Sequence, residues 1–173
     1  YERNEMTIIK TWLQFYDDVQ KFAYGLVELG VEEYKSVMIQ GFNSYEWVVA
    51  HFGTITAGCL SSGVYTTNTS TVCKYMVEDC DAQVLVVEDT KQLEKYRECM
   101  DEIKHRIKAI IIWSDFDNID RFWYEKDRPF PVIHFCDFVY SRFVSEKRLM
   151  ELEKRTKKIT PWRCQSLIYT SGT

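Results

Sequence analysis

A chain of 173 residues with 46% hydrophobic and 28% charged residues is long enough for one globular domain with a substantial core. Its formal net charge of −4 argues against a general attraction to nucleic acid. The sequence has no run of about 18 apolar residues, so we expect no membrane-spanning helix. Charges among the first residues also argue against a secretory signal peptide.

The cysteines and histidines show no pattern typical of a metal site. The six cysteines form no C-x-x-C pair, and the three histidines fall in no metal-ligand spacing. We therefore expect no metal ligands in this chain and interpret the cysteines as reduced, buried hydrophobic residues. Reduced cysteines are typical of a reducing compartment, which favours a cytoplasmic location.

The first predicted helix runs from a capping box to a glycine. Thr11 and Gln14 form a T-x-x-Q pattern, in which the two side chains can satisfy free backbone N–H groups at the start of a helix. Apolar residues follow at helical spacing as far as Gly30, which suits the end of a helix. A short apolar strand is predicted next at 37–39, ending at Gly41.

A second helix, a strand and a short helix follow. Asn43 is the predicted N-cap of the second helix, with Glu46 three residues later, and this helix extends towards Gly58. Residues 60–65 form the next predicted strand, and a short helix is expected around 71–77. Strands and helices therefore alternate from the beginning of the chain.

This alternation continues and determines the fold class. Residues 84–87 and 109–113 are continuous apolar runs, typical of strands buried on both faces. Between them, Asp89 and Gln92 are the predicted cap of a single helix with apolar positions at Leu93, Tyr96, Met100 and Ile103. Such strands alternating with helices predict an α/β fold, with a parallel sheet flanked by helices on both faces.

The following part of the chain is less regular. Residues 114–131 are rich in Asp, Asn, Arg and Pro, and we interpret them as a surface insertion or loop. A short strand is predicted at 132–135 and a charged helix at 146–158. This helix carries a basic cluster that is more typical of a solvated face than of a membrane contact: Lys154, Arg155, Lys157 and Lys158.

Two further groups of residues fit either packing or a pocket. Thr66, Thr67 and Asn68 follow a predicted strand and could shape an acyl or nucleotide pocket, although we favour a hydrogen-bonded turn whose side chains cap the next helix. For the aromatic residues on predicted helical faces, we favour a core over a lipid pocket. These are Trp12, Phe15, Tyr16, Phe22, Trp47 and Phe52.

The last predicted strand, at 166–169, leads directly into Thr170, Ser171, Gly172 and Thr173. In a parallel α/β sheet, ligands bind beyond the carboxyl ends of the strands. A loop of small hydroxyl residues around a glycine suits a phosphate there, because backbone N–H groups can approach the anion and hydroxyls donate further hydrogen bonds. An ordinary Ser/Thr/Gly turn explains the same residues, and the sequence contains no Walker A pattern.

Residues 167–173, with the sequence LIYTSGT, resemble the start of the Y-T-S-G-T-T-G-x-P-K-G signature of the adenylate-forming superfamily. Residues 41–47, 63–68 and 84–88 resemble segments of the long-chain acyl-CoA synthetases, and the bubblegum type is the most similar of these. The resemblance covers residues 8–113 and 160–173, whereas residues 114–158 match poorly.

This resemblance implies that residues 1–173 are a partial N-terminal AMP-binding domain, truncated inside its phosphate-binding loop. Enzymes of this kind use ATP and Mg²⁺ to convert a fatty acid to an acyl-adenylate, and then transfer the acyl group to coenzyme A. It also implies that Thr170, Ser171, Gly172 and Thr173 bind the ATP phosphates. The catalytic and metal-binding residues of the family lie beyond this chain, so we expect this piece alone to make no acyl-CoA.

Other functions fit the same residues. A ligase for another carboxylic acid and a non-catalytic α/β interaction module both remain as alternatives. The family is often associated with the cytoplasmic face of membranes, and a peripheral association of this kind is compatible with the sequence. A partial domain would expose sheet edges and helix faces, so we expect the isolated chain to be marginally stable or prone to aggregation.

Overall fold

The computed structural model describes residues 2–3, 6–124, 129–140 and 144–170, and its centre is a parallel sheet. The neighbouring strands of this sheet are all paired in parallel, which confirms the predicted α/β fold. A separate antiparallel pair, β1 (Glu2–Arg3) and β2 (Met6–Thr7), precedes the sheet. The order across the sheet is β7 (Val132–His134), β6 (Ala109–Ile112), β5 (Ala82–Val87), β3 (Ser36–Gln40), β4 (Leu60–Val64) and β8 (Ser166–Ile168).

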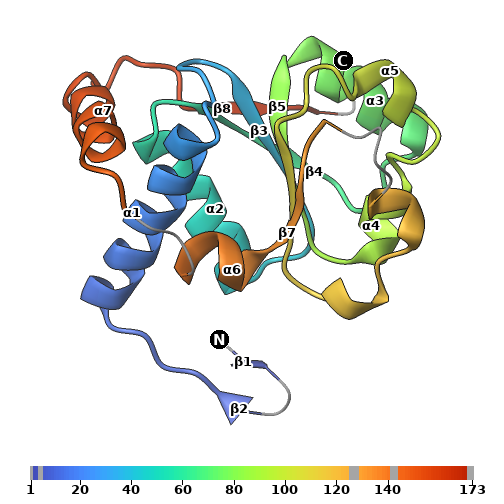
Figure 1. The fold of residues 1–173 in the computed structure, drawn as a ribbon, viewed down its shortest axis with the longest axis horizontal. Helices are drawn as coiled ribbons and strands as arrows, with labels where there is room; N and C mark the ends of the chain where they lie inside the picture. Colours follow the sequence, from blue (N-terminus) through green and yellow to red (C-terminus); the bar gives the residue numbers. More distant parts are fainter. Residues whose placement is uncertain (1, 4–5, 125–128, 141–143, 171–173) are drawn as a thin grey trace.

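Helices cover both faces of the sheet (Figure 1). Alternate residues of β5 enter two separate cores. Val84 and Val86 pack on one side of the sheet, and Leu85 and Val87 pack on the other. The continuous apolar runs in the sequence follow from this burial on both faces. The first side is covered by α1 (Trp12–Glu28), α2 (Tyr45–Thr56), α6 (Phe135–Tyr140) and α7 (Glu146–Lys157), and the second by α3 (Ser70–Asp79), α4 (Thr90–Glu94) and α5 (Met100–Ile103).

The segment between β6 and β7 contains two short 3-10 helices in its described part, η1 (Phe116–Asn118) and η2 (Arg121–Tyr124). Trp123 is buried in the core on the α3–α5 side, and its Nε1 donates a hydrogen bond of 2.8 Å to Glu94 Oε1. The interpretation of residues 114–131 as an insertion stays a prediction.

Two predicted helix caps are confirmed. At the start of α1, Thr11 Oγ1 accepts a hydrogen bond of 3.2 Å from the backbone N–H of Gln14. The Gln14 side chain accepts one of 2.8 Å from the backbone N–H of Thr11, which completes the capping box. At the start of α4, Asp89 Oδ1 accepts a hydrogen bond of 2.9 Å from Gln92 N–H.

The predicted cap of α2 was wrong by one residue. Ser44, not Asn43, precedes the helix, and its hydroxyl accepts a hydrogen bond of 3.1 Å from Trp47 N–H. Serine and asparagine are equally good caps, so the sequence alone does not choose between them. The extended backbone at Ser44 makes the choice, and Asn43 instead lines a cleft described below.

The single helix predicted from Asp89 to Ile103 was also wrong, because it is divided into α4 and α5. Between them the backbone forms tighter turns, in which Tyr96 N–H bonds to Leu93 O and Arg97 N–H bonds to Glu94 O. The predicted apolar positions are nevertheless all buried against the sheet, so the burial pattern was correct where the helix was not.

The expectation that six aromatic residues form the core was correct only in part. Phe22 is fully buried, and Phe15 and Trp47 pack partly buried against the core. Trp12 is 85% exposed, and Tyr16 and Phe52 are also exposed. Helical spacing identifies a row of residues on one side of a helix, but it cannot show whether another element covers that side.

The basic cluster on α7 is solvated with one exception. Lys154, Lys157 and Lys158 are exposed, as expected of a solvated face. Arg155 is buried, and its guanidinium bonds to backbone carbonyl groups of other elements. The signal for this was its position three residues after the buried Leu152, which places both on one side of the helix.

Candidate functional site

A cleft of about 410 Å³ lies over the carboxyl ends of three neighbouring strands. Its lining includes Phe42 after β3, Thr66 after β4 and Tyr169 after β8. After β3 the chain enters α2 on one face of the sheet, and after β4 it enters α3 on the other face. Because these two connections diverge, they leave a crevice where ligands bind in α/β sheets.

Two glycines shape the cleft in different ways. At Gly41, an added Cβ would lie 2.4 Å from Trp113 Cζ2 and 2.7 Å from Glu88 Cβ, so a larger residue does not fit there. At Gly63 in β4, an added Cβ would meet only Trp47, at 3.6 Å. The missing side chain at Gly63 therefore leaves room in the cleft itself.

One wall of the cleft comes from α2. The rings of Trp47 and His51 stack one helical turn apart, with centroids separated by 5.3 Å. His51 Nδ1 and Ser61 Oγ of β4 share a hydrogen bond of 2.8 Å. Burial lowers the pKa of His51, which favours the neutral imidazole. Because Ser61 is only 2% exposed, the pair suits hydrogen bonding within the wall and not nucleophilic attack on a substrate.

A buried polar network fixes the loop that follows β4. Gln40 at the end of β3 donates a hydrogen bond of 3.1 Å to Tyr65 O and accepts one of 2.8 Å from Tyr96 OH. Gln40 and Tyr96 are fully buried, so these bonds satisfy groups that would be costly to bury unpaired. Lys95 Nζ also donates to Thr66 O. The network therefore fixes the backbone at the rim of the cleft.

The turn that we favoured at Thr66, Thr67 and Asn68 is confirmed, because Asn68 N–H donates a hydrogen bond of 3.1 Å to Tyr65 O. The predicted cap of the next helix was wrong by one residue. Thr69 provides this cap, because its hydroxyl accepts a hydrogen bond from the backbone N–H of Val72 in the first turn of α3. Thr66 belongs to both interpretations, because it lies in the turn and also lines the cleft.

The end of β8 leads to the predicted phosphate-binding residues. Tyr169 lines the cleft, and its OH donates a hydrogen bond of 2.6 Å to Asp79 Oδ2 of α3. Burial, and then this bond to Asp79, raise the pKa of Tyr169. Thr170 follows as an exposed residue, whereas the predictions for Ser171–Thr173 lie outside the described residues.

The described lining of the cleft is uncharged. It includes no Asp, Glu, Lys or Arg side chain, so it offers an anionic ligand neutral hydrogen-bonding groups. Within the described ranges, no three His, Cys, Asp or Glu side chains form a group that could hold a metal ion. No helix in the same part of the chain is long and apolar enough to cross a bilayer.

The α2 wall of this cleft was not predicted from the sequence. Trp47 had been assigned to the core, and His51 and Ser61 to no role. The signal was the i, i+4 spacing of Trp47 and His51 on a helix that directly follows a strand of the sheet. Their approach to β4 depends on tertiary packing, which the spacing does not contain.

The chain resembles known proteins along nearly all of its length. A family model described as AMP-binding enzyme matches residues 5–173. The long-chain-fatty-acid–CoA ligase ACSBG2 of Xenopus laevis is 35% identical over 164 residues, which are 94% of this chain and 21% of that protein. The long-chain-fatty-acid–CoA ligase ACSBG1 of Rattus norvegicus is 40% identical over 105 residues, which are 61% of this chain and 14% of that protein.

The chain thus spans only a minor part of these relatives. Among solved structures, MbtA of Mycobacterium smegmatis without ligand matches 97% of this chain and 28% of its own chain, with a TM-score of 0.71. The sequences are 16% identical, so this likeness concerns the fold alone.

Proposed function

The chain belongs to the AMP-binding enzyme family, and on this basis we propose that it is the first part of the AMP-binding domain of a long-chain-fatty-acid–CoA ligase. The relatives with this name support the proposal, since one of them matches 94% of the chain. Because the chain covers 21% of that relative, we assign the whole reaction to a longer protein that contains residues 1–173.

In the proposed reaction, a carboxylate oxygen of the fatty acid attacks the α-phosphorus of ATP. Pyrophosphate leaves, and an acyl-adenylate forms. The sulfur of coenzyme A then attacks the acyl carbon after its thiol has lost a proton, AMP leaves, and the thioester forms. In such a reaction the protein contributes mainly by positioning the reactants and by stabilising charge.

Thr170, Ser171, Gly172 and Thr173 are the residues that we propose as contacts of the ATP phosphates. One observation carries this proposal: the carboxyl end of β8 lies beside those of β3 and β4, at an uncharged cleft. Hydroxyl groups and backbone N–H groups at this edge suit phosphate oxygens. We assign no catalytic side chain within this chain.

Mg²⁺ and coenzyme A belong to the proposal for the longer enzyme. The described residues contain no group of metal-ligating side chains, so we assign no step to Mg²⁺ here. We also propose a cytoplasmic location, which the six cysteines support because all of them are free. The role in fatty acid metabolism is supported by the relatives named above.

Exchange of labelled pyrophosphate into ATP tests this function in the full-length protein. We expect exchange that depends on a long-chain fatty acid, and thioester formation when coenzyme A is added. The 173-residue chain alone should make no acyl-CoA. Exchange with benzoate or a short acid instead of a long-chain acid would show that the substrate class is wrong, and no exchange with any acid would contradict the ligase.

The proposed phosphate contacts are tested by variants of the same protein. Thr170→Val and Ser171→Ala should each lower the rate of exchange, together by about 10²-fold, because they remove hydrogen-bond donors to the phosphates. Thr67→Val is the matched control, since Thr67 is exposed and does not line the cleft. Equal rates for all three variants and the wild type would overturn the site.

A further inference from the structure

The strand β8 has little to determine its own register. It pairs with β4 through only three residue positions, Ser61 with Ser166, Ser62 with Leu167 and Gly63 with Ile168. In the described sheet β8 is an edge strand, so no second neighbour fixes it. A strand with this short a ladder is prone to slip along its partner unless something else holds it.

The side-chain pattern of β8 adds little. Leu167 packs only partly buried against the α3–α5 core, while Ile168 on the opposite face is exposed. Burial of a long apolar face normally specifies register, because a slip by one residue turns every side chain to the wrong face. Here only two half-buried side chains on that face, Leu167 and the following Tyr169, carry that preference.

Arg163 ties the residues before the two strands together. Gly58 stands three residues before Ser61, and Arg163 stands three residues before Ser166, so the two precede their strands by the same distance. Arg163 Nη2 donates a hydrogen bond of 2.6 Å to Gly58 O. This bond therefore joins the segments that lead into β4 and β8 at equivalent positions.

The position of the Arg163 side chain is strongly constrained. It is 6% exposed, its Nη2 lies 3.3 Å from Glu33 Oε2, and its guanidinium lies over the Tyr34 ring at 4.1 Å. Gly58 has a φ of +75°, and an added Cβ there would lie 3.0 Å from Arg163 Nη2. A planar guanidinium can lie flat on a ring while its N–H groups point to a carbonyl and a carboxylate, and a tetrahedral ammonium does not reproduce this geometry.

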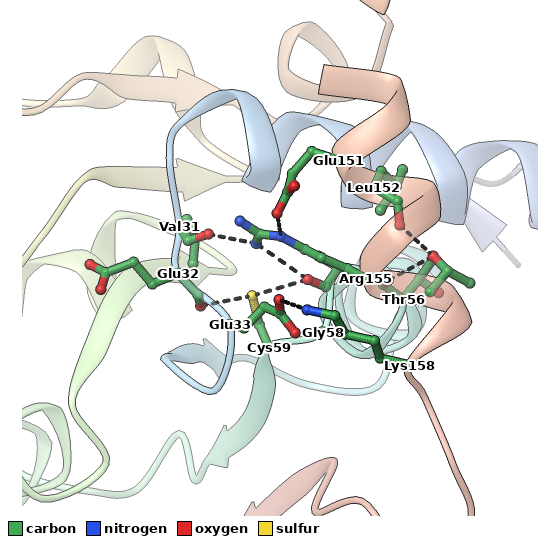
Figure 2. A network of polar contacts seen from close by, with 12 residues as sticks. Val31, Glu32, Glu33, Thr56, Gly58, Cys59, Glu151, Leu152, Arg155 and Lys158 are labelled. Carbon is green, nitrogen blue, oxygen red and sulfur yellow. Dashed lines mark hydrogen bonds and ion pairs between the residues drawn. The ribbon is translucent and has the colours of Figure 1, made fainter. Parts of the chain in front are cut away.

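The helix that precedes β8 is fixed to the same region (Figure 2). Arg155 of α7 donates hydrogen bonds to Val31 O at 2.7 Å and Ala57 O at 3.4 Å, which lie just before β3 and β4. Lys158 at the end of α7 donates one of 2.8 Å to Glu33, the carboxylate that Arg163 also contacts. These bonds fix the end of α7, where the segment that leads into β8 begins, relative to β3 and β4.

At the other end of β8, the hydrogen bond from Tyr169 to Asp79 holds the strand to α3. The strand is thus fixed at both ends by side chains, and only three residues lie in its ladder. A slip by one position would move the residue after Tyr169 by about 3.3 Å along the strand.

We propose that Arg163 is a positioning residue that sets the register of β8 against β4 and thereby places Thr170 at the cleft. This rests on the proposed function, in which Thr170 begins the contacts to the ATP phosphates. Arg163 itself contacts no substrate in this proposal. It acts through the backbone of β8.

The test compares Arg163→Met with the matched control Arg148→Met, because Arg148 is an exposed arginine on α7. In the full-length enzyme, Arg163→Met should raise the KM for ATP in pyrophosphate exchange by about tenfold, since displaced contacts weaken binding and catalysis together. A loss of folded protein alone would lower the apparent kcat and leave KM unchanged. Arg148→Met should match the wild type.

Amide hydrogen exchange in the same enzymes tests how firmly β8 is held against β4, and this measurement does not depend on catalytic activity. Arg163→Met should speed exchange in the peptide that covers residues 163–170, while the peptide that covers β5 stays protected. Arg163→Lys keeps the charge and one donating nitrogen but loses the flat contact with Tyr34, so both effects should be smaller than in Arg163→Met. It also serves as the test variant if Arg163→Met does not fold.

Wild-type KM for ATP in a folded Arg163 variant, or unchanged exchange in β8, would overturn the positioning role and leave the proposed function intact. A wild-type enzyme without pyrophosphate exchange would overturn the proposed function instead. In that case the hydrogen exchange of β8 alone decides whether Arg163 sets the register.

Discussion

At the scale of single residues, His51 forms part of one wall of the cleft, and its burial disfavours the charged form of its side chain. His51 is half-buried between Trp47 and Ser61, and burial lowers its pKa from the ordinary value of 6.5. Between the lowered pKa and 6.5, the unfolded chain binds a proton at this residue and the folded chain does not. The contribution of His51 to the free energy of unfolding therefore falls as the pH falls from 6.5 to the lowered pKa.

The variant His51→Gln should remove this dependence. We expect its free energy of unfolding to change less between pH 7 and pH 5 than that of the wild type, measured by urea unfolding at several pH values. His105→Gln is the control, because His105 is exposed and lies outside the cleft. If His51→Gln and the wild type lose the same stability over this range, burial of His51 does not suppress its charge.

At the scale of elements, α1 and α2 approach each other closely through a glycine. An added Cβ at Gly53 of α2 would lie 2.7 Å from Phe22 Cδ1 and 2.9 Å from Phe22 Cβ. Phe22 is fully buried and in contact with Phe138 and Phe135, so it has no free space to move into. The contact between the helices therefore requires glycine at this position.

Gly53→Ala should destabilise the chain by about 1–3 kcal/mol through overpacking. The same exchange at an exposed helical position would stabilise by up to about 1 kcal/mol, so the sign of the effect is the test. Gly63→Ala is the control, because its new methyl group meets only Trp47 at an ordinary distance. Thermal or urea unfolding measures both, and a stabilised Gly53→Ala would disprove the close contact.

The sequence allowed the elements to be predicted better than their contacts. Local signals were sufficient for the helix caps at Thr11 and Asp89 and for the alternation of strands and helices, because these signals depend on neighbours in the chain. The choice of Ser44 over Asn43 depends on backbone conformation. The break between α4 and α5 depends on packing against the sheet, which local spacing does not report.

The candidate site shows the same division. The placement of β8 with its carboxyl end at the cleft could be predicted, because all strands of a parallel sheet point the same way. The partners of β8 could not. Arg155 and Arg163 were assigned to a solvated helix face and to no role, since their carbonyl acceptors lie about a hundred positions away in the chain.

At the scale of the whole molecule, an apolar surface lies on the outer side of α1 and α2. Trp12 and Leu13 are 85% and 77% exposed, and Tyr16 and Phe52 are exposed nearby. Phe15 connects the two helices through an edge-on contact with Phe52, with ring centroids 5.9 Å apart. An exposed patch of this kind promotes association in water.

The isolated 173-residue chain should therefore self-associate. We expect its weight-average sedimentation coefficient to rise with concentration in the micromolar range. The double variant Trp12→Lys and Leu13→Lys should reduce this rise, because it charges the patch. Trp162→Lys is the control, since Trp162 is 95% exposed but belongs to the segment before β8. A concentration-independent monomer with a sharp, reversible melting transition would contradict the expectation.

The pairing of β8 with β4 has a consequence for the order in which the cleft is built. Ser61 and Ser166 are partners, so about a hundred residues are synthesised between the two sides of this ladder. At about 5–20 residues per second, β4 therefore leaves the ribosome on the order of ten seconds before β8. During that interval the nascent chain carries the cleft without its β8 side, which is added only when residues 166–168 emerge.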